Sequence, residues 1–353
     1  MNPIIESDFS SILADNSISW SEFAGRTVVI SGAAGFLPFY MAGTLLFLNK
    51  TQKLNKPVRV IALVRNLEKA HKKFHDFLDD KNLIFVKSDL SSPITIDGDV
   101  DYIVHAAGHA SPKLFFTDPV GTIKANTAGI IHLLDLAVKK KVKSFLYFST
   151  GEVNGNIFDA LDNVTENDYG VVDPLAVRSC YAESKRMGEN LCVAYAHQYG
   201  LNTKIVRPSH TYGPGFALDD GRVFAAFVSD VLTDKDIVLK SDGKANRCFL
   251  YLTDATRGYF TVLLKGTSAN AYNVSNDYEI PILELAQLIL EVSGKKNLKV
   301  CFDVAISPSA TNKHARMDNS KLKALGWKPT IKEREGFARV ISYFQKENYD
   351  LAR

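Results

Sequence analysis

The stretch Thr27-Val28-Val29-Ile30-Ser31-Gly32-Ala33-Ala34-Gly35-Phe36-Leu37-Pro38 decides the fold. It begins as a β-branched apolar run, stops at two glycines, and continues into an apolar helical stretch at 37–48. We therefore expect a buried strand, a glycine turn and a helix. Glycines at such a turn let backbone amides approach a phosphate at a helix N-terminus. Because Pro38 replaces the usual third glycine, the segment indicates a dinucleotide site but leaves a plain tight turn as the alternative.

The same alternation continues along the chain. Further apolar strands are expected at 58–64, 83–86, 102–104, 144–149 and 203–206, and helical patterns fill the gaps. This order predicts an α/β fold, a doubly wound parallel sheet of Rossmann type with right-handed crossovers.

Three segments are expected along the chain. Residues 1–24 form an N-terminal extension with a short helix, and residues 25–212 form mainly the dinucleotide-binding domain. Turn-rich segments follow, so residues 213–353 are interpreted as mainly a smaller substrate-binding α/β part, interleaved with the first.

Composition excludes several classes of protein. The 353 residues are 46% hydrophobic and 23% charged, as in ordinary soluble proteins. A net charge of +3 from 42 basic and 39 acidic side chains is too balanced to predict nucleic-acid binding. Four cysteines without paired spacing predict neither a metal site nor disulfides. With no signal-like start and no 18-residue apolar run, we expect a cytoplasmic protein that does not bind membranes.

Two residues after the predicted strands are candidates for the adenosine end of a cofactor. Arg65 stands where an acidic residue would normally bind ribose hydroxyls, so it pairs with a 2′-phosphate, stacks on adenine, or is a solvated charge. Asp89 either accepts from the adenine amine or caps a helix. NAD is the expected cofactor, and Arg65 leaves NADP as an alternative.

Tyr181 and Lys185 stand four residues apart, on one face of a helix. The lysine charge is expected to lower the pKa of the phenol, which would then take a proton from a sugar hydroxyl while hydride leaves the same carbon. A plain helix surface pair is the alternative. Thr150 and Glu152, placed where the fifth strand ends, favour the catalytic interpretation because they lie at the same sheet edge.

With these residues in place, positions 27–337 resemble the extended short-chain dehydrogenase/reductase family, in particular its nucleotide-sugar epimerases, dehydratases and decarboxylases. The motifs most similar to those of UDP-glucuronate decarboxylases are Val177-Arg178-Ser179-Cys180-Tyr181-Ala182-Glu183-Ser184-Lys185-Arg186, Thr211-Tyr212-Gly213-Pro214, Asp220-Gly221-Arg222-Val223 and Leu325-Gly326-Trp327-Lys328-Pro329. The resemblance implies that Thr150 and Tyr181 contact the sugar C4 hydroxyl, Lys185 the nicotinamide ribose, and Glu152 the pyranose ring.

The resemblance also implies the remaining contacts. Arg222 and Arg247 would hold the diphosphate or sugar, since guanidinium groups bind phosphate bidentately. The substrate set is completed by Ser111, Arg178 and His210, and the cofactor set comprises Gly32, Gly35, Phe36, Leu37, Arg65, Asp89, Leu90, Ala106, Ala107, Gly108 and Lys185. Asn126 matches a structural asparagine. As alternatives, the small residues at 106–108 allow tight packing and Asn126 satisfies buried backbone.

The chain departs from the family pattern at three positions. Gly151 stands where decarboxylases carry serine and dehydratases carry the aspartate that expels the C6 hydroxyl, so dehydration lacks its proton donor. His210 replaces an asparagine and Gly215 an arginine. The favoured hypothesis is an enzyme that oxidises a nucleotide-diphosphate sugar transiently at C4, with UDP-glucuronate decarboxylation as the best subtype.

Two other hypotheses remain: a 4-epimerase or 4-keto reductase, and a non-catalytic dinucleotide-binding sensor. A homodimer through helices at 123–140 and 181–199 is also implied by the resemblance.

Overall fold

The centre of the molecule is a seven-stranded parallel sheet. This computed structural model describes residues 1–51, 54–108, 110, 112–158, 160–307 and 316–347. The strands are β1 (Thr27–Ser31), β2 (Arg59–Val64), β3 (Leu83–Lys87), β4 (Tyr102–His105), β5 (Ser144–Phe148), β6 (Thr203–Pro208) and β11 (Asn270–Val274). Every pairing between them is parallel, so the predicted α/β class is confirmed.

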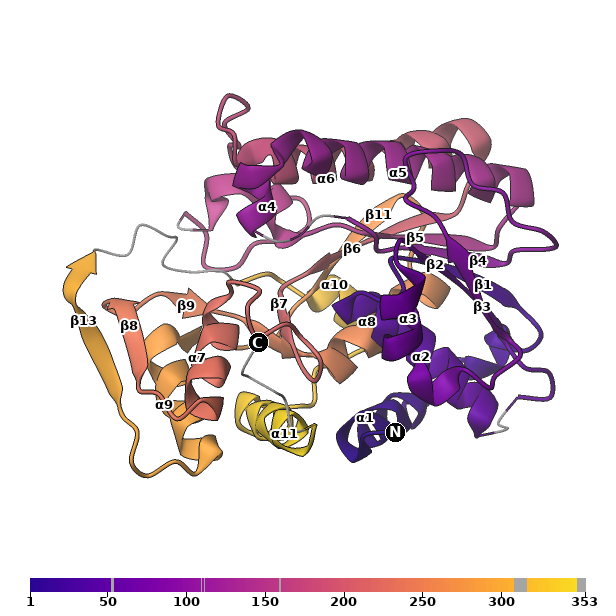
Figure 1. The fold of residues 1–353 in the computed structure, drawn as a ribbon. Helices are drawn as coiled ribbons and strands as arrows, with labels where there is room; N and C mark the ends of the chain where they lie inside the picture. The colour runs from indigo at the N-terminus through magenta and orange to yellow at the C-terminus, as the bar shows by residue number, and fades with distance from the viewer. Residues whose placement is uncertain (52–53, 109, 111, 159, 308–315, 348–353) are drawn as a thin grey trace.

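The strand order reverses direction in the middle of the sheet, between β1 and β4. It runs β11-β6-β5-β4-β1-β2-β3, so the chain proceeds one way from β1 and resumes on the other side with β4 (Figure 1). In open α/β sheets, ligands bind beyond the carboxyl ends of the strands where this reversal occurs. The loops after β1 and β4 are therefore the expected walls of a ligand site.

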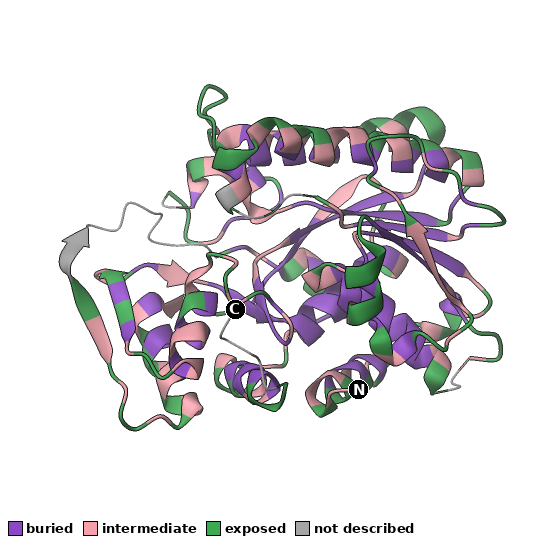
Figure 2. Cartoon of the chain, viewed as in Figure 1, coloured by how far each residue is buried: buried purple, intermediate pink, exposed green. Residues whose placement is uncertain are grey.

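Helices cover both faces because successive strand residues point to opposite sides. Val29 and Ile61 pack with α5 (Pro119–Lys140) and α6 (Ser179–Tyr199), whereas Val28 and Ile30 pack with α2 (Phe36–Lys50) and α8 (Leu252–Lys265). With both faces covered, the inner strands β1, β4 and β5 are wholly buried, whereas the edge strand β3 is half-buried (Figure 2).

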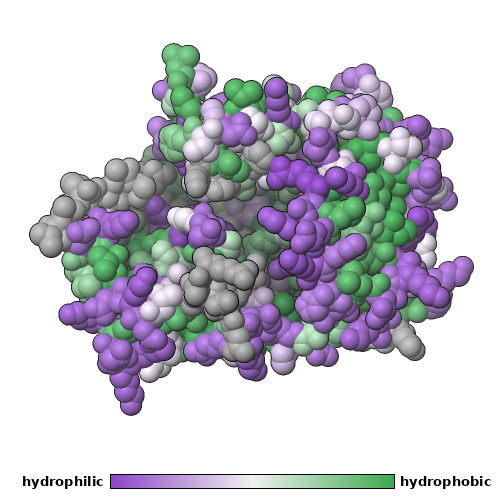
Figure 3. Space-filling view, in the orientation of Figure 1, coloured by the Kyte–Doolittle hydropathy of each residue, from purple (hydrophilic) through white to green (hydrophobic). Residues whose placement is uncertain are grey.

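A second lobe has its own core and short strands. Its elements are β7 (His210–Tyr212), α7 (Val223–Leu232), β8 (Ile237–Ser241), β9 (Asn246–Arg247), β10 (Phe249–Tyr251), β12 (Ile280–Pro281), α9 (Ile282–Ser293), β13 (Val300–Ser307) and α11 (Glu333–Lys346). The strands pair as β7 with β10, β9 with β12, and β8 with β13. On the face shown in Figure 3, the surface is hollowed between this lobe and the sheet lobe.

The two lobes exchange chain segments, because α8 and β11 from residues 213–353 belong to the sheet lobe. The shorter helices are α3 (Leu67–Lys73), α4 (Pro112–Thr117) and α10 (Ser320–Lys323). The division at residue 212 stays a prediction.

The N-terminal extension is anchored by a buried carboxylate. Helix α1 (Pro3–Leu13) carries Asp8, which has no exposed surface. Asp8 accepts hydrogen bonds from the hydroxyls of Tyr40 and Tyr251, both at 2.9 Å, and from the guanidinium of Arg339 at 2.8 Å. Burial raises the pKa of Asp8 to about 6, against the opposing effect of these donors. One side chain of α1 thus contacts α2, β10 and α11.

Within the described part of the chain, no helix combines the length and apolar character needed to cross a bilayer. No cluster of three or more metal-ligating side chains is found among the same residues. All four cysteines are free thiols.

Candidate active site

The glycine turn after β1 leaves the backbone exposed to a ligand. Gly32 has φ +65°, and a Cβ placed on it would lie 2.9 Å from the Cα of Ala107 in the loop after β4. Gly35 is the N-cap of α2, and its amide donates to the Gly32 carbonyl at 2.7 Å. Phe36 and Leu37 follow in the first turn. A helix N-terminus therefore opens at the reversal point, where its amides and dipole favour a pyrophosphate.

We expect Gly32→Ala to weaken NAD binding and lower stability. The new methyl group both occupies a left-handed backbone position and clashes with the Ala107 backbone, for a combined cost of about 2–4 kcal/mol. Gly200→Ala is the matched control, since Gly200 has φ +66° but nothing within 4 Å of its Cβ position. Urea unfolding and NAD titration measure both effects. Equal losses in the two variants would contradict the role of the close contact.

A buried hydroxyl connects the loops after β1 and β4. Ser31 Oγ lies 2.8 Å from Nδ1 of His105 and accepts from the amides of Ala106 and Ala107 at 3.2 and 3.1 Å. Burial, with the Lys185 charge, lowers the pKa of His105 to about 3. The ring is therefore neutral, and its Nδ1 shares a hydrogen bond with the Ser31 hydroxyl, so the loop expected beside the cofactor is held to β1.

The predicted catalytic residues come together where β5 ends. Thr150 caps the helical turn η3 (Gly151–Ile157), and its hydroxyl acts to lower the pKa of the Tyr181 phenol at the start of α6, which places the two side chains near each other. Tyr181 is 7% exposed and stacks on Phe115 from α4, with ring centroids 4.5 Å apart. The phenol is thus held in one position, beside the hydroxyl of Thr150.

Electrostatics at Tyr181 differ from the sequence expectation. Burial first, then the Glu152 charge, raise the pKa of Tyr181, whereas Thr150, Arg178 and Arg222 act to lower it. The net shift is opposite to the lowering expected from Lys185, because burial dominates and the main opposing charges are guanidinium groups; a contribution of Lys185 itself stays a prediction.

Lys185 lies one helical turn further, under the loop after β4. Its Nζ donates to the Phe148 carbonyl at 2.8 Å and lies 3.4 Å from a Cβ built on Gly108. Burial lowers the pKa of Lys185 to about 8. Its position between β5 and Gly108 suits a contact with the cofactor.

These two pKa shifts predict the pH dependence of catalysis. Tyr181 must lose its proton to act as a base, and Lys185 must keep its own to remain a cation. Below about pH 8, Lys185 is charged and the deprotonated fraction of Tyr181 rises with pH. Above that pH, the loss of the lysine charge offsets the further rise in the deprotonated fraction of Tyr181. We therefore expect kcat/KM to climb to about pH 8 and then level off. Initial rates across the range test this, and a maximum well below neutral pH would contradict it.

Glu152 and Arg178 pair with each other. The guanidinium donates to both carboxylate oxygens, at 2.8 and 3.1 Å, and lies 5.7 Å from the centroid of Phe115. Sequence reasoning treated one as a contact to the sugar ring and the other as a substrate contact. The structure instead makes them a bidentate ion pair at the edge of the Tyr181 site, with each side chain partly exposed.

The other predicted substrate residues form a cationic group in the second lobe. His210 lies on β7, and burial, then Arg247 and Arg222, lower its pKa to about 4. Arg222 is oriented by Asp220, whose Oδ2 accepts from Nε at 2.7 Å, and by the Thr211 carbonyl at 3.2 Å. The Arg222 charge also acts to lower the pKa of Tyr181, so this group lies on the side of the molecule that faces the predicted catalytic tyrosine.

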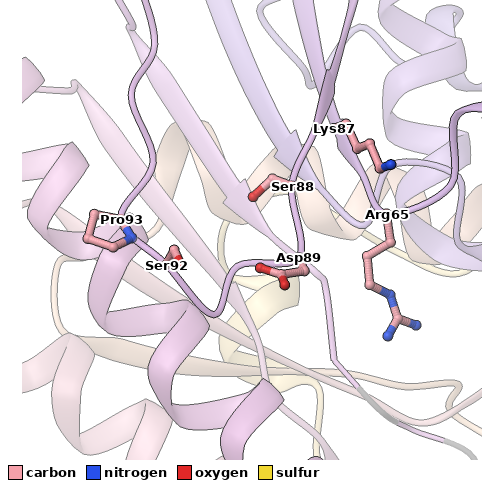
Figure 4. Close-up of a pocket in the computed structure, with 6 residues that line it drawn as sticks. All are labelled: Arg65, Lys87, Ser88, Asp89, Ser92 and Pro93. Carbon is pink, nitrogen blue, oxygen red and sulfur yellow. The ribbon is translucent and has the colours of Figure 1, made fainter.

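A pocket of about 400 Å³ lies beyond β2 and β3, where the sequence places the adenosine end of the cofactor. It is lined by Arg65, Lys87, Ser88, Asp89, Ser92 and Pro93 (Figure 4). Asp89 accepts from the amide and hydroxyl of Ser91 at 2.9 and 2.8 Å, which lowers its pKa, so it closes a turn rather than capping a helix. Sequence analysis missed Lys87, a second cation beside Arg65.

Two further predicted contacts are those of Leu90 with the cofactor and of Ser111 with the substrate. The side chain of Leu90 is buried in the core below α5, which leaves only its main chain for a cofactor. Ser111 lies outside the described residues.

The residues fit a nicotinamide dinucleotide. Asn126 donates to Ser184 at 3.0 Å, but its buried Oδ1 has no partner among the described residues and lies 2.5 Å from the Cβ position of Gly108. Three features therefore lie together at the reversal point: the bare backbone of Gly108, the unpartnered Oδ1 of Asn126 and the ammonium group of Lys185. A polar ligand end, such as a nicotinamide riboside, matches that set.

The chain matches the model of the NAD dependent epimerase/dehydratase family over residues 28–275. It is 32% identical over 322 residues to UDP-glucuronic acid decarboxylase 3 of Arabidopsis thaliana, covering 90% of this chain and 89% of that relative. The chain belongs to the NAD dependent epimerase/dehydratase family. UDP-glucuronic acid decarboxylase 1 of Xenopus tropicalis is 29% identical over 328 residues, covering 93% of this chain and 74% of the relative.

Solved structures share the fold. An epimerase from Methanothermobacter thermautotrophicus superposes with a TM-score of 0.80 at 20% identity, covering 99% of this chain and 98% of the other. A UDP-glucuronic acid 4-epimerase from Bacillus cereus gives a TM-score of 0.74 at 22% identity, covering 91% and 99%. The extended short-chain dehydrogenase/reductase fold, the enzymatic character and the NAD cofactor expected from the sequence are confirmed. The NADP alternative stays a prediction.

Proposed function

We propose that this enzyme oxidises a nucleotide-diphosphate sugar transiently at C4, and that it decarboxylates UDP-glucuronate. The observation that carries the proposal is the buried Tyr181 phenol, stacked on Phe115, near Thr150 and one helical turn from Lys185, at the reversal point of an NAD-binding sheet. The similarity to two UDP-glucuronic acid decarboxylases over 90% and 93% of the chain supports this choice of substrate.

The chain's own residues account for the proton movements. NAD, held by the glycine turn after β1 and by the Lys185 side chain, would supply the acceptor, and later the donor, of the C4 hydride. Tyr181 removes the C4 hydroxyl proton, and the Thr150 hydroxyl stabilises the oxygen on which charge develops. With C4 a ketone, the C5 carboxylate leaves as carbon dioxide, the bonding electrons pass into the C4–C5 enolate, and C5 then takes up a proton. Tyr181 returns its proton when C4 is reduced.

The second lobe supplies the substrate anchor. Arg222 and Arg247 concentrate positive charge beside a neutral His210, which suits a diphosphate with a hydrogen-bonding neighbour. Asp220 and the Thr211 carbonyl hold Arg222 in place, so the guanidinium needs little reordering on binding.

Mass spectrometry after incubation with UDP-glucuronate and NAD tests the proposal. A product lighter by one carbon dioxide is expected. An unchanged substrate mass would remove decarboxylation.

A 4-epimerase is the second candidate. Gly151 offers no side chain, and the Glu152 carboxylate beside it is paired with Arg178, which favours chemistry confined to C4. In that case the nucleotide sugar would keep its mass and invert at C4, as NMR would show. Bound NAD without any change in any sugar would indicate a sensor instead.

We also propose a homodimer through α5 and α6, which lie side by side over one face of the sheet (Figure 1). Their outer sides expose Val120 (60%), Ile123 (44%) and Val193 (42%), an apolar surface that suits a two-fold helix packing. Light scattering should give twice the mass of one chain, and a monomer would refute this.

A further inference from the structure

A methionine from the C-terminal part of the chain takes the place of the side chain that Gly151 lacks. A Cβ built on Gly151 would lie 2.8 Å from Sδ and 3.3 Å from Cε of Met317. The two residues are distant in sequence, so only the fold brings them together. The thioether thus fills the volume in which a side chain at position 151 would begin.

The position of Met317 is fixed by backbone pairing. The residues on either side of Met317 hydrogen-bond with Val164. The Val164 amide donates to the Arg316 carbonyl at 3.1 Å, and the Asp318 amide donates to the Val164 carbonyl at 2.8 Å. Its side chain is 4% exposed and clusters with Phe158 and Val164. The wall that it forms is therefore apolar and rigid.

This wall adjoins the residues that are expected to contact the reacting carbon. Gly151 lies between Thr150, which acts on the pKa of Tyr181, and Glu152. A sugar whose C4 hydroxyl meets Tyr181 and Thr150 has its neighbouring ring substituents only a few bonds away. Met317 is thus placed to border a substituent next to the oxidised carbon.

We propose that Met317 is a specificity-determining residue that withholds water and hydrogen bonds from the carboxylate on C5, which rests on the proposed function. A carboxylate next to a thioether loses hydration without gaining a partner, so its bound ground state is raised in free energy. As carbon dioxide leaves, negative charge passes from the carboxylate into the ring enolate. The apolar surroundings therefore raise the free energy of the transition state less than that of the bound substrate. Met317 therefore weakens binding of the carboxylated sugar and speeds loss of its carboxyl group.

Equilibrium binding tests this without turnover. Calorimetric titrations use NAD-loaded protein carrying Tyr181→Phe, with UDP-glucuronate and with UDP-xylose, which lacks the carboxylate. Met317→Gln keeps the volume and adds an amide donor, so UDP-glucuronate should bind about fivefold or more tightly. Affinity for UDP-xylose should stay within about twofold. Met317→Leu, which preserves the apolar wall, should match the parent for both ligands.

Kinetics supply the second readout. With Tyr181 intact, Met317→Gln should lower both KM and kcat for UDP-glucuronate, the signature of removed ground-state strain. Met317→Ala, which admits water, should shift affinity in the same direction if the glutamine variant does not fold. Equal changes for both ligands, or none, would overturn the inference. If the parent enzyme releases no carbon dioxide, the proposed function fails, yet the ratio of the two affinities still decides the role of Met317.

Discussion

Replacing Tyr181 with phenylalanine is expected to lower kcat by about 10²–10⁴-fold, the usual contribution of a positioned general base. The phenol oxygen, near Thr150, is the group proposed to take the C4 proton. Phenylalanine keeps the ring that stacks on Phe115 at 4.5 Å, so the fold and NAD binding should persist. Stopped-flow absorbance of reduced nicotinamide and steady-state rates with UDP-glucuronate measure the loss.

Tyr195→Phe is the matched control on the same helix. Tyr195 donates to Asp135 at 2.6 Å on the exposed side of α6, away from Thr150, so its loss should change kcat by less than about twofold. If Tyr181→Phe kept activity within tenfold of the parent, the assignment of Tyr181 as the base would be wrong. If it failed to bind NAD, the residue would be structural.

The inner strands could be predicted from the sequence because a strand that is buried on both faces needs a continuous run of apolar residues. Val28, Val29 and Ile30 form β1, with both faces covered, so a continuous β-branched run marks the strand. The glycine turn and α2 followed from the same stretch. The Tyr181 and Lys185 spacing likewise places both on one helical face, as the structure confirms.

β11 could not be predicted because its stability comes from distant partners. It contains two asparagines. Asn273 can be buried because its backbone amide donates to the Glu166 carboxylate at 2.7 Å and its side-chain Nδ2 donates to the Val164 carbonyl at 3.1 Å. A polar residue that depends on partners more than one hundred positions away gives no local signal. The seventh strand was therefore missed.

The site shows the same limit. Thr150 and Ala107 follow strands of one parallel sheet, so their shared edge was predictable. The Glu152–Arg178 pair, the Phe115 stack and the Met317 wall depend on how loops approach one another across that edge. Such contacts have no spacing that a sequence would reveal.

The largest stability loss is expected for Asp254→Ala. This α8 carboxylate has no exposed surface and accepts from the amides of Thr330 and Ile331 at 2.7 and 2.8 Å. It also pairs with Arg257, and its backbone carbonyl accepts from Trp327 Nε1 at 2.8 Å. Asp254 thus fastens the segment around 325–329, singled out by its sequence, to α8, together with Lys265, which donates to the Leu325 carbonyl at 3.3 Å.

Alanine at position 254 would leave the buried Arg257 guanidinium without one carboxylate partner and two half-buried amides without their acceptor. We expect the free energy of unfolding to fall by about 3–5 kcal/mol, because an uncompensated buried charge costs more than the pair itself contributes. Urea unfolding measures the loss against Glu291→Ala, which removes an exposed ion pair with Arg334 and should cost at most about 1 kcal/mol. Because Asp254 lies outside the Tyr181 site, kcat per folded molecule should not change. An unfolding midpoint equal to that of the parent would mean that Arg257, which also contacts Asp15 at 3.3 Å, finds enough compensation there.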